Sequence, residues 1–559
     1  MGWNSWDCFA TTITEEQTKA QAAFMADKLK AHGWQYIVID AQWFEPGAQG
    51  HEYRKDAVLT MDGFGRLQPA PNRFPSAADG SGFRALAAYV HSLGLKLGIH
   101  LMRGIPRQAV EKNLPILGTR FHAQDIADKV HSCTWNADMF GVDMSKPGAQ
   151  EYYDSVFALI ADWGVDYVKV DDLSRPYFQN LPEVEAVRRA IDKTGRPMVL
   201  SLSPGATDIK AAAHVAAHAN LWRISDDLWD RWLSVREQFA RLALWNPQRR
   251  AGAWPDADML PLGTLVLGKR GTRLTVDEQV TLMTLWSIAR SPLMYGGDMT
   301  KLDELTTSLL TNDEVLAINQ RSTGSRLLFD HDGLVAWTAD DSSNGDNYLA
   351  VFNARDRVRL DESNARQPAA VITPAADSSA SIDTDLTDGR RLFLLATPLA
   401  DIDGFLAVRW QNPRFVFADG SEHGLDEFAW VNADALWDSA TFQKSSTGQA
   451  SELRAQPAVL VEYAVPDGAR RFRATVRLER PYDHQTQDRV RVLTVVGTES
   501  NEDRRLGLPV EVALDQLGIA GEVKVRDLWK RADLGTAKGR FSPEVPFHGA
   551  RLFRLSSRK

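Results

Sequence analysis

The first 320 residues alternate between two kinds of segment, and this rhythm constrains the fold more than any other feature of the chain. Short apolar runs, typical of buried strands, are separated by longer stretches with the spacing of amphipathic helices. The expected strands are Met1–Trp6, Gln35–Asp40, Lys96–Leu101, Asp166–Asp171, Met198–Ser203, Leu221–Ser225, Ala251–Trp254 and Pro292–Tyr295. Eight such units over this length indicate a (β/α)8 barrel with loop insertions.

The helices between these strands have recognisable ends. Thr14 and Gln17 have the spacing of a capping box, and Gly33 stands where a glycine would end the same helix. Further helices are expected at Phe83–Leu93, Ala149–Trp163, Glu183–Lys193, Ile209–His218, Trp229–Leu244, Asp277–Arg290 and Asp303–Asn319.

After Asn319 the pattern changes to strand-like runs separated by Gly, Asp, Asn and Ser, which predicts an all-β region. The segment Asp361–Asp385 is rich in Ala, Ser, Asp, Thr and Pro and is interpreted as a linker or long loop. Strands are expected at Leu334–Thr338, Tyr348–Phe352, Arg391–Ala396, Phe405–Trp410, Val459–Val465, Phe472–Leu478, Val523–Leu528, Phe541–Val545 and Arg551–Leu555.

Composition narrows the functional class. The 559 residues are 44% hydrophobic and 25% charged, which is typical of a globular chain with a large core. The net charge is −9 and no basic run dominates any segment, so we expect no nucleic-acid partner. No apolar run approaches the roughly 18 residues of a membrane span, and this chain shows no signal peptide. The two cysteines, Cys8 and Cys133, leave the redox compartment open.

Polar residues recur where the expected strands end, which is where barrel enzymes carry their reacting groups. Any one Asp at such a place serves equally well as a cap for the next helix. Here, however, carboxylates follow many of the strands, with Lys169 and Arg223 among them, and this pattern favours a polar pocket lined by carboxylates. The residues at the strand ends are Trp6, Asp40, His100, Lys169, Asp171, Asp172, Ser203, Arg223, Asp226, Asp227, Asp256 and Asp258.

Motifs for other chemistries are absent from the sequence. There is no H-E-x-x-H, no paired Cys-x-x-C, no serine-nucleophile elbow and no phosphate-binding glycine loop. Asp256 and Asp258 have the spacing to hold a divalent ion, which remains an alternative, but we expect neither a metal nor a cofactor. Carboxylates together with 17 tryptophans indicate glycoside hydrolysis, in which one carboxylate attacks or activates water and a second carboxyl protonates the leaving oxygen.

Several motifs resemble, in order, those of glycoside hydrolase family 27, the melibiase or α-galactosidase family. They are Gly2-Trp3-Asn4-Ser5-Trp6, Tyr36–Asp40, Leu95–His100, Asp166–Asp172, Trp222-Arg223 with Asp227, Trp254–Leu260 and Ser291–Met294. The resemblance covers about residues 1–320. It implies a (β/α)8 barrel, followed by an antiparallel β-sandwich, that acts on an oligosaccharide or polysaccharide.

The resemblance also assigns roles to the strand-end residues. It implies that Asp171 is the nucleophile and Asp227 the acid/base, and that Trp6 lies under the sugar. Asp40, Lys169, Arg223 and Asp258 are then hydroxyl-binding groups, and His100 and Ser203 complete the expected substrate-binding set.

Residue chemistry agrees with the two catalytic roles. Lys169 precedes Asp171 by two positions on one strand face, where its charge favours an ionised carboxylate. Asp227 lies among Asp226, Asp230 and the indoles of Trp229 and Trp232, a setting expected to raise its pKa. We interpret Asp226 as the cap of the following helix.

The sequence departs from the family pattern at positions that determine which sugar the site binds. Many members have a second Asp after the strand-two Asp, and the pair holds O4 and O6 of galactose, whereas here Ala41 follows Asp40. Strand five ends in Leu202-Ser203-Pro204, where many family members have Cys-Glu-Trp. Leu173 stands after Asp172, where family members often have a cysteine. The long segment Met102–Met139 is expected to form an altered wall.

Terminal α-D-galactosides are therefore the first expected substrates of a retaining exo-α-glycosidase. Alternatives are a β-L-arabinopyranoside or an isomalto-type α-glucan. A non-hydrolytic carbohydrate-binding protein is a further alternative, but the presence of both Asp171 and Asp227 argues against it.

The resemblance extends into the C-terminal half. Residues 1–322 are expected to form the barrel, 323–356 with 491–559 the C-terminal sandwich, and 357–490 a linker plus an inserted β-sandwich. The run Val459–Gly468 with Arg471 and Phe472 resembles a sugar-binding module of the NPCBM type. Trp410, Trp430 and Trp437 are candidates for stacking on sugar, with a core position as the alternative. The family resemblance suggests a secreted or periplasmic protein.

Overall fold

The computed structural model describes the whole chain except residues 376, 400–405, 445–450, 480–487, 499–502 and 558–559. Its first part is an eight-stranded parallel sheet in the order β10-β9-β8-β7-β3-β2-β1-β13. A parallel bridge between Leu260, which follows β10, and Tyr295 of β13 joins the two ends. The expected barrel is thus confirmed. Its strands are β1 (Gly2–Asn4), β2 (Tyr36–Ile39), β3 (Lys96–Met102), β7 (Tyr167–Asp171), β8 (Val199–Leu202), β9 (Leu221–Arg223), β10 (Trp254–Asp256) and β13 (Met294–Tyr295).

Helices α2 (Glu15–Phe24), α3 (Arg84–Ser92), α6 (Ala149–Asp162), α7 (Tyr177–Thr194), α8 (Ala212–His218), α9 (Trp232–Trp245), α10 (Val276–Ala289), α11 (Glu304–Leu310) and α12 (Asp313–Arg321) surround the sheet. The capping box is confirmed, because the Thr14 side chain accepts a hydrogen bond from the Gln17 N–H. Gly33 ends the helical segment with φ of 94°. The single helix expected at Asp303–Asn319 is divided, and the Asn312 side chain caps its second part by accepting from the Glu314 N–H.

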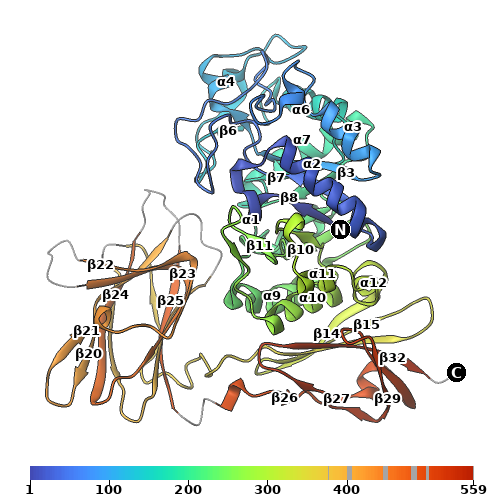
Figure 1. Cartoon of the computed structure of the whole chain (residues 1–559). Coiled ribbons are helices and arrows are strands. Elements are labelled where there is room, and N and C mark those ends of the chain that lie inside the picture. The colour runs from blue at the N-terminus through green and yellow to red at the C-terminus, as the bar shows by residue number, and fades with distance from the viewer. Residues whose placement is uncertain (376, 400–405, 445–450, 480–487, 499–502, 558–559) are drawn as a thin grey trace.

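Two antiparallel sheets follow the barrel (Figure 1). The C-terminal sheet has the order β14-β15-β16-β32-β28-β29-β30-β27, so it combines strands from both sides of the inserted segment. Its strands are β14 (Thr323–His331), β15 (Leu334–Asp340), β16 (Asn347–Asn353), β27 (Val512–Ala513), β28 (Glu522–Asp527), β29 (Ala532–Lys538), β30 (Arg540–Phe541) and β32 (Ala550–Ser557).

The inserted sheet has the order β17-β25-β19-β23-β20-β24-β18, with β21 and β22 paired at its side. Its strands are β17 (Ala370–Ile372), β18 (Ala380–Asp385), β19 (Arg391–Pro398), β20 (Ala407–Phe417), β21 (Glu422–Gly424), β22 (Asn432–Lys444), β23 (Ser451–Ala464), β24 (Ala469–Glu479) and β25 (Val490–Gly497). Phe405, the first residue of one expected strand, lies outside the described residues.

The structure corrects two boundaries in this region. The expected linker Asp361–Asp385 contains β17 and β18, because alternate residues such as Ile382 and Thr384 are buried although the local composition is polar. The boundary expected at 490/491 cuts β25, which pairs with β17 and β19 of the inserted sheet. Strand character alone does not tell which of two sheets a strand joins.

The inserted sheet has a hydrophobic core of its own, and Trp410 is fully buried in it. Trp430 is 37% exposed and stacks on Phe442, while the side chain of Trp437 lies outside the described residues. In the described part of the chain, no helix combines the length and apolarity needed to cross a membrane.

The C-terminal sheet covers α10, a helix that is buried over most of its length. The Thr281 hydroxyl donates to the carbonyl of His548 (2.7 Å), and the Trp529 indole N–H donates to the Thr284 hydroxyl (2.8 Å). His548 also pairs with Glu278 (2.7 Å). Barrel and sheet therefore share a polar as well as an apolar interface.

Candidate active site

The expected site residues all lie at the carboxyl end of the parallel sheet. Asp40, Ser203 and Asp258 follow β2, β8 and β10, while Asp171 and Arg223 are the last residues of β7 and β9. His100 and Lys169 are register partners on the neighbouring strands β3 and β7, and Trp6 begins the short helix α1 (Trp6–Phe9) after β1. Most of these side chains contact one another in two hydrogen-bonded groups.

The first group centres on Asp40. The Lys169 ammonium donates to Asp40 Oδ2 (2.9 Å), and the Asn4 amide donates to the same oxygen (2.7 Å). The Ser5 hydroxyl accepts from the Asp40 N–H (2.9 Å). Burial alone would raise the Asp40 pKa, but the charges of Lys169 and His100 lower it below its ordinary value. Sequence reasoning missed Asn4 and Ser5 as supports of Asp40, although both lie in the Gly2–Trp6 motif.

Asp171 is the most strongly stabilised carboxylate of the site. The Ser203 hydroxyl donates to its Oδ1 (2.9 Å), and His100 Nε2 lies 3.4 Å from its Oδ2. Against the cost of burial, the His100 contact and the charges of His100 and Lys169 hold the Asp171 pKa well below its usual range. The sequence predicts the effect of Lys169, whereas the larger effect of His100 is seen only in the structure. Asp171 is therefore ionised and oriented at any neutral pH.

A buried ion pair supports the loop that follows Asp171. Arg103 contacts Asp172 through Nη2 (2.8 Å) and Glu183 through Nη1 (2.6 Å), and its side chain is only 4% exposed. Asp172 is thus held away from a direct role, and its N–H donates to Asp171 Oδ1 (3.2 Å).

The second group joins Arg223, Asp258 and Asp227. Arg223 Nη2 lies 2.7 Å from Asp258 Oδ2 and 3.3 Å from Asp227 Oδ1. Burial raises the Asp227 pKa to about 7, with Asp226 and Asp258 adding to the increase and Arg223 opposing it. A substantial share of Asp227 is thus protonated near neutrality, in contrast to Asp171.

The surroundings of Asp227 differ from the expected ones. Asp226 is not a helix cap, since Arg231 occupies the N-cap of α9. Its Oδ1 instead accepts from the Asp227 N–H (2.9 Å), and its Oδ2 pairs with Arg175 (3.2 Å). Asp230 is bound by Arg270, so Asp258 takes the position near Asp227 that Asp230 was expected to have. The helix starts three residues later than expected, which frees this loop to carry the carboxylates.

The alternative of a divalent ion at Asp256 and Asp258 finds no support in the contacts of these residues. Asp258 Oδ2 faces the Arg223 guanidinium and also accepts from the Leu228 N–H (2.7 Å), while Asp256 Oδ1 accepts from the Asp258 N–H (3.0 Å). A cation between these carboxylates would have to displace Arg223.

Aromatic side chains form one wall of the site. Trp6 stacks on Tyr53 with ring centroids 6.1 Å apart, and His51 contacts the edges of both Trp6 and Trp229 (5.7 Å each). The charges of Asp171, Asp40 and Asp227 add to burial in raising the Tyr53 pKa, so Tyr53 lies near all three carboxylates. His51 and Tyr53 come from the loop after β2, and no sequence motif marked them.

A cleft of about 310 Å³ adjoins Asp227 on the side of the inserted sheet. Residues of the Asp227 loop and α9 line one side, and Pro398, Leu399, Pro457 and Ala458 of the inserted segment line the other. Arg231 connects the two sides, because its Nη2 donates to the Ala458 carbonyl (2.9 Å) and its Nη1 pairs with Asp434 (3.2 Å).

Comparison with protein families gives two matches. A family model described as alpha galactosidase A matches residues 1–145 and 107–321. A second, described as the alpha galactosidase C-terminal beta sandwich domain, matches residues 490–555.

Individual proteins agree with these matches. Alpha-galactosidase 2 of Arabidopsis thaliana is 28% identical over 325 residues, which are 58% of this chain and 67% of the plant protein. A GH27 β-L-arabinopyranosidase from Geobacillus stearothermophilus is 37% identical with a TM-score of 0.70, and the match covers 100% of this chain and 96% of that one. A putative α-N-acetylgalactosaminidase from Bacillus halodurans is 34% identical with a TM-score of 0.66 and coverage of 100% and 97%.

Proposed function

Since this chain belongs to glycoside hydrolase family 27, the melibiase family of glycoside hydrolases, we propose that it is a retaining exo-glycosidase that prefers terminal β-L-arabinopyranosides to α-D-galactosides. The observation that carries the mechanism is the opposite pKa shift of two carboxyls in one pocket. Asp171 is held ionised, whereas the pKa of Asp227 is raised to about 7. Such a pair suits a nucleophile and a proton donor.

The reaction proceeds in two displacements. Asp171 attacks the anomeric carbon while Asp227 transfers its proton to the glycosidic oxygen, so the C–O bond to the leaving group breaks and a glycosyl ester forms. Asp227, now a carboxylate, then takes a proton from water as the water oxygen attacks the same carbon. The ester bond breaks, Asp171 leaves as a carboxylate, and the released sugar keeps its anomeric configuration.

Ala41 supports the preference for the arabinoside. β-L-Arabinopyranose matches α-D-galactopyranose at O2, O3 and O4 but lacks the hydroxymethyl group that carries O6. By resemblance, the carboxylate that usually follows Asp40 would contact O4 and O6, and Ala41 offers a methyl group instead. A site discriminates strongly for a hydroxyl only if it has a polar group that would otherwise stay unpaired. The 37% identical arabinopyranosidase, which matches the full chain, points the same way. This reverses the order of preference expected from the sequence.

The remaining site residues fit the recognition of a small polar ring. Asp40, Lys169, Arg223 and Asp258 offer charged hydrogen-bonding groups for sugar hydroxyls. Trp6 and Tyr53 offer apolar faces, while His100 and Ser203 position Asp171. The cleft beside Asp227 is the place for the leaving group, because the proton donor must lie between sugar and aglycone.

For the inserted module we propose carbohydrate binding, on the basis of its resemblance to the NPCBM type. Trp430 is the stacking candidate, since it is partly exposed while Trp410 is a core residue. Loss of binding to insoluble polysaccharide in Trp430→Ala, measured by a pull-down assay, tests this role.

The main proposal is tested by comparing kcat/KM on nitrophenyl β-L-arabinopyranoside and nitrophenyl α-D-galactoside. We expect the arabinoside to be the better substrate. Asp171→Ala should lose turnover on both, by at least about 10⁴-fold, and azide should restore part of it by attacking in place of the carboxylate. Full activity in Asp171→Ala would refute the assignment, and a clear preference for the galactoside would refute the substrate order.

A further inference from the structure

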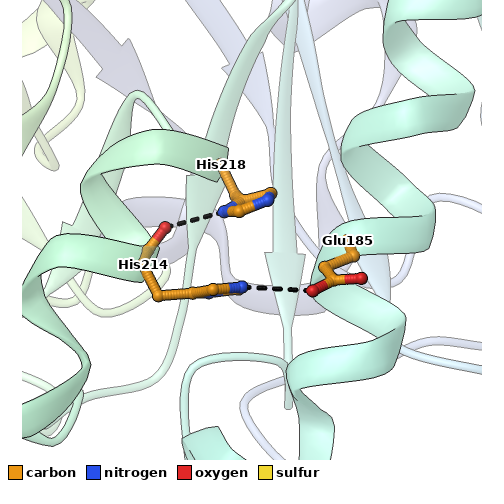
Figure 2. Close-up of side chains that lie close together, drawn as sticks. All are labelled: Glu185, His214 and His218. Carbon is orange, nitrogen blue, oxygen red and sulfur yellow. Dashed lines mark hydrogen bonds and ion pairs between the residues drawn. The ribbon is translucent and has the colours of Figure 1, made fainter.

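A cluster of two histidines and a glutamate lies outside the sugar pocket, between two outer helices of the barrel. Glu185 lies on α7, and His214 and His218 lie one turn apart on α8 (Figure 2). One ligand atom from each residue lies within 4.8 Å of the others. Within the part of the chain that the structure describes, this is the one such group of three or more potential metal ligands. We propose that it binds a divalent transition-metal ion of the Zn²⁺ class and links α7 to α8.

The ligand atoms already converge. His214 Nε2 and Glu185 Oε1 are 3.3 Å apart, close to the separation of about 3.4 Å between two ligands of a tetrahedral zinc ion with bonds near 2.1 Å. The two imidazole rings stack with centroids 4.0 Å apart and an angle of 19° between their planes. Because the lone pair of each ring lies in the ring plane, one ring has to turn out of this stack for both Nε2 atoms to reach one ion.

Both rings hold their Nδ1 atoms in hydrogen bonds, while the Nε2 of His214 faces Glu185. His218 Nδ1 lies 2.8 Å from the carbonyl oxygen of His214, which only accepts, so Nδ1 carries the proton and Nε2 a lone pair. His214 Nδ1 lies 2.8 Å from the Tyr177 hydroxyl, which both donates and accepts. His214 can therefore switch to the tautomer with a free Nε2 while keeping this bond. Metal-binding histidines usually hold their second nitrogen in this manner.

Glu185 supplies the charged ligand. Its Oε2 pairs with Arg189 on the same helix (3.1 Å), which leaves Oε1 directed at His214. Two neutral imidazoles and one carboxylate form a known zinc-binding set that leaves a fourth position for water.

The position of the cluster indicates a stabilising role. Helices α7 and α8 follow β7 and β8, the strands whose ends hold Asp171 and Ser203. The cluster shares no residue with the pocket, so a bound ion would connect the outer helices without taking part in the reaction.

The test is titration of the EDTA-treated full-length protein with ZnCl₂ by calorimetry. We expect one Zn²⁺ per chain and, with CoCl₂, the visible absorption of tetrahedral Co²⁺. Glu185→Gln and His218→Ala should each lower the Zn²⁺ affinity at least 10-fold, and Tyr177→Phe about 10-fold. His423→Ala is the matched control, because His423 pairs with Glu427 (2.9 Å) without belonging to such a group.

The wild-type thermal midpoint should rise with Zn²⁺, and that of Glu185→Gln should not. Absence of Zn²⁺ binding in the wild type would overturn the proposal. Binding that survives in both Glu185→Gln and His218→Ala, or that is lost in His423→Ala, would place the ion elsewhere and overturn it equally. Far-UV circular dichroism of the variants separates loss of the site from loss of folding.

Discussion

The pH dependence of activity should follow Asp227, and Asp226 offers a way to move it. A general acid must be protonated, so kcat/KM should be full below the Asp227 pKa and fall about tenfold per pH unit above about 7. Asp171 causes no change of kcat/KM with pH in this range, because its pKa lies well below its usual value. Asp226→Asn removes a negative charge that raises the Asp227 pKa.

The size of this effect can be worked from the structure. The amide introduced by Asp226→Asn keeps an oxygen to accept from the Asp227 N–H, so this contact is retained while the charge and the ion pair with Arg175 are lost. The side chains of Asp227 and Asp226 are 38% and 47% exposed, so solvent screens their repulsion to about 1 kcal/mol, which equals about 0.7 pH unit. Because Arg175 already neutralises part of the Asp226 charge, we expect the limb to move down by about 0.5 unit.

The assay is the pH profile of kcat/KM between pH 5 and 9 on a nitrophenyl glycoside. One pH unit above the wild-type limb, Asp226→Asn should be about 3-fold less active than wild type, while both are equal at low pH. Asp226→Glu keeps the charge and should leave the limb near its wild-type position. An unmoved limb, or one that moves upward, would show that Asp226 does not control the proton donor.

Three further predictions concern specificity, stereochemistry and stability. Ala41→Asp should raise the ratio of kcat/KM for the α-D-galactoside to kcat/KM for the β-L-arabinopyranoside by about 10- to 150-fold, the value of one charged hydrogen bond to the extra hydroxyl. Ala41→Leu should not raise this ratio. An unchanged ratio in Ala41→Asp would contradict the role of residue 41. Proton NMR of the first-formed product should show the anomer of the substrate, and release of the opposite anomer would exclude the double displacement. Arg103→Met leaves Asp172 and Glu183 buried without their cation and should lower the free energy of unfolding by about 3–5 kcal/mol. The loss should be seen as a lower urea concentration at the unfolding midpoint. An unchanged midpoint would mean that water or another cation compensates.

Local patterns predicted the parts of the fold that local physics determines. The strands of the barrel were expected within a few residues of their positions, because each is a short apolar run bounded by helical spacing. The Thr14 capping box is likewise a property of four consecutive residues. The inserted sheet was less predictable, since β17 and β18 are stabilised by distant partners and not by their own composition.

In the site, sequence reasoning found which residues come together but not how they pair. Asp40, Lys169 and Asp171 could be placed at strand ends from the pattern alone. That His100 and Ser203 contact Asp171 depends on the register of neighbouring strands, which the pattern does not contain. The His214–His218 spacing is visible in the sequence, whereas Glu185 joins it only through the packing of α7 on α8. The sequence predicts a helix cap at Asp226 because it predicts the start of α9 three residues too early.

The strands that pack on α10 come from distant parts of the chain, and this affects folding during synthesis. Thr281 finds its partner at His548, 267 residues later in the chain, and β32, which also packs on this helix, follows still later. β15 and β16 pack on α10 and precede the inserted segment, but at a synthesis rate of roughly 5–20 residues per second the last strand of its cover, β32, follows Thr281 after roughly 13–55 s. During this interval the part of α10 that β32 covers stays exposed. The inserted segment lies between β16 and β32 in the sequence and therefore lengthens the time before the last layer over the barrel can form.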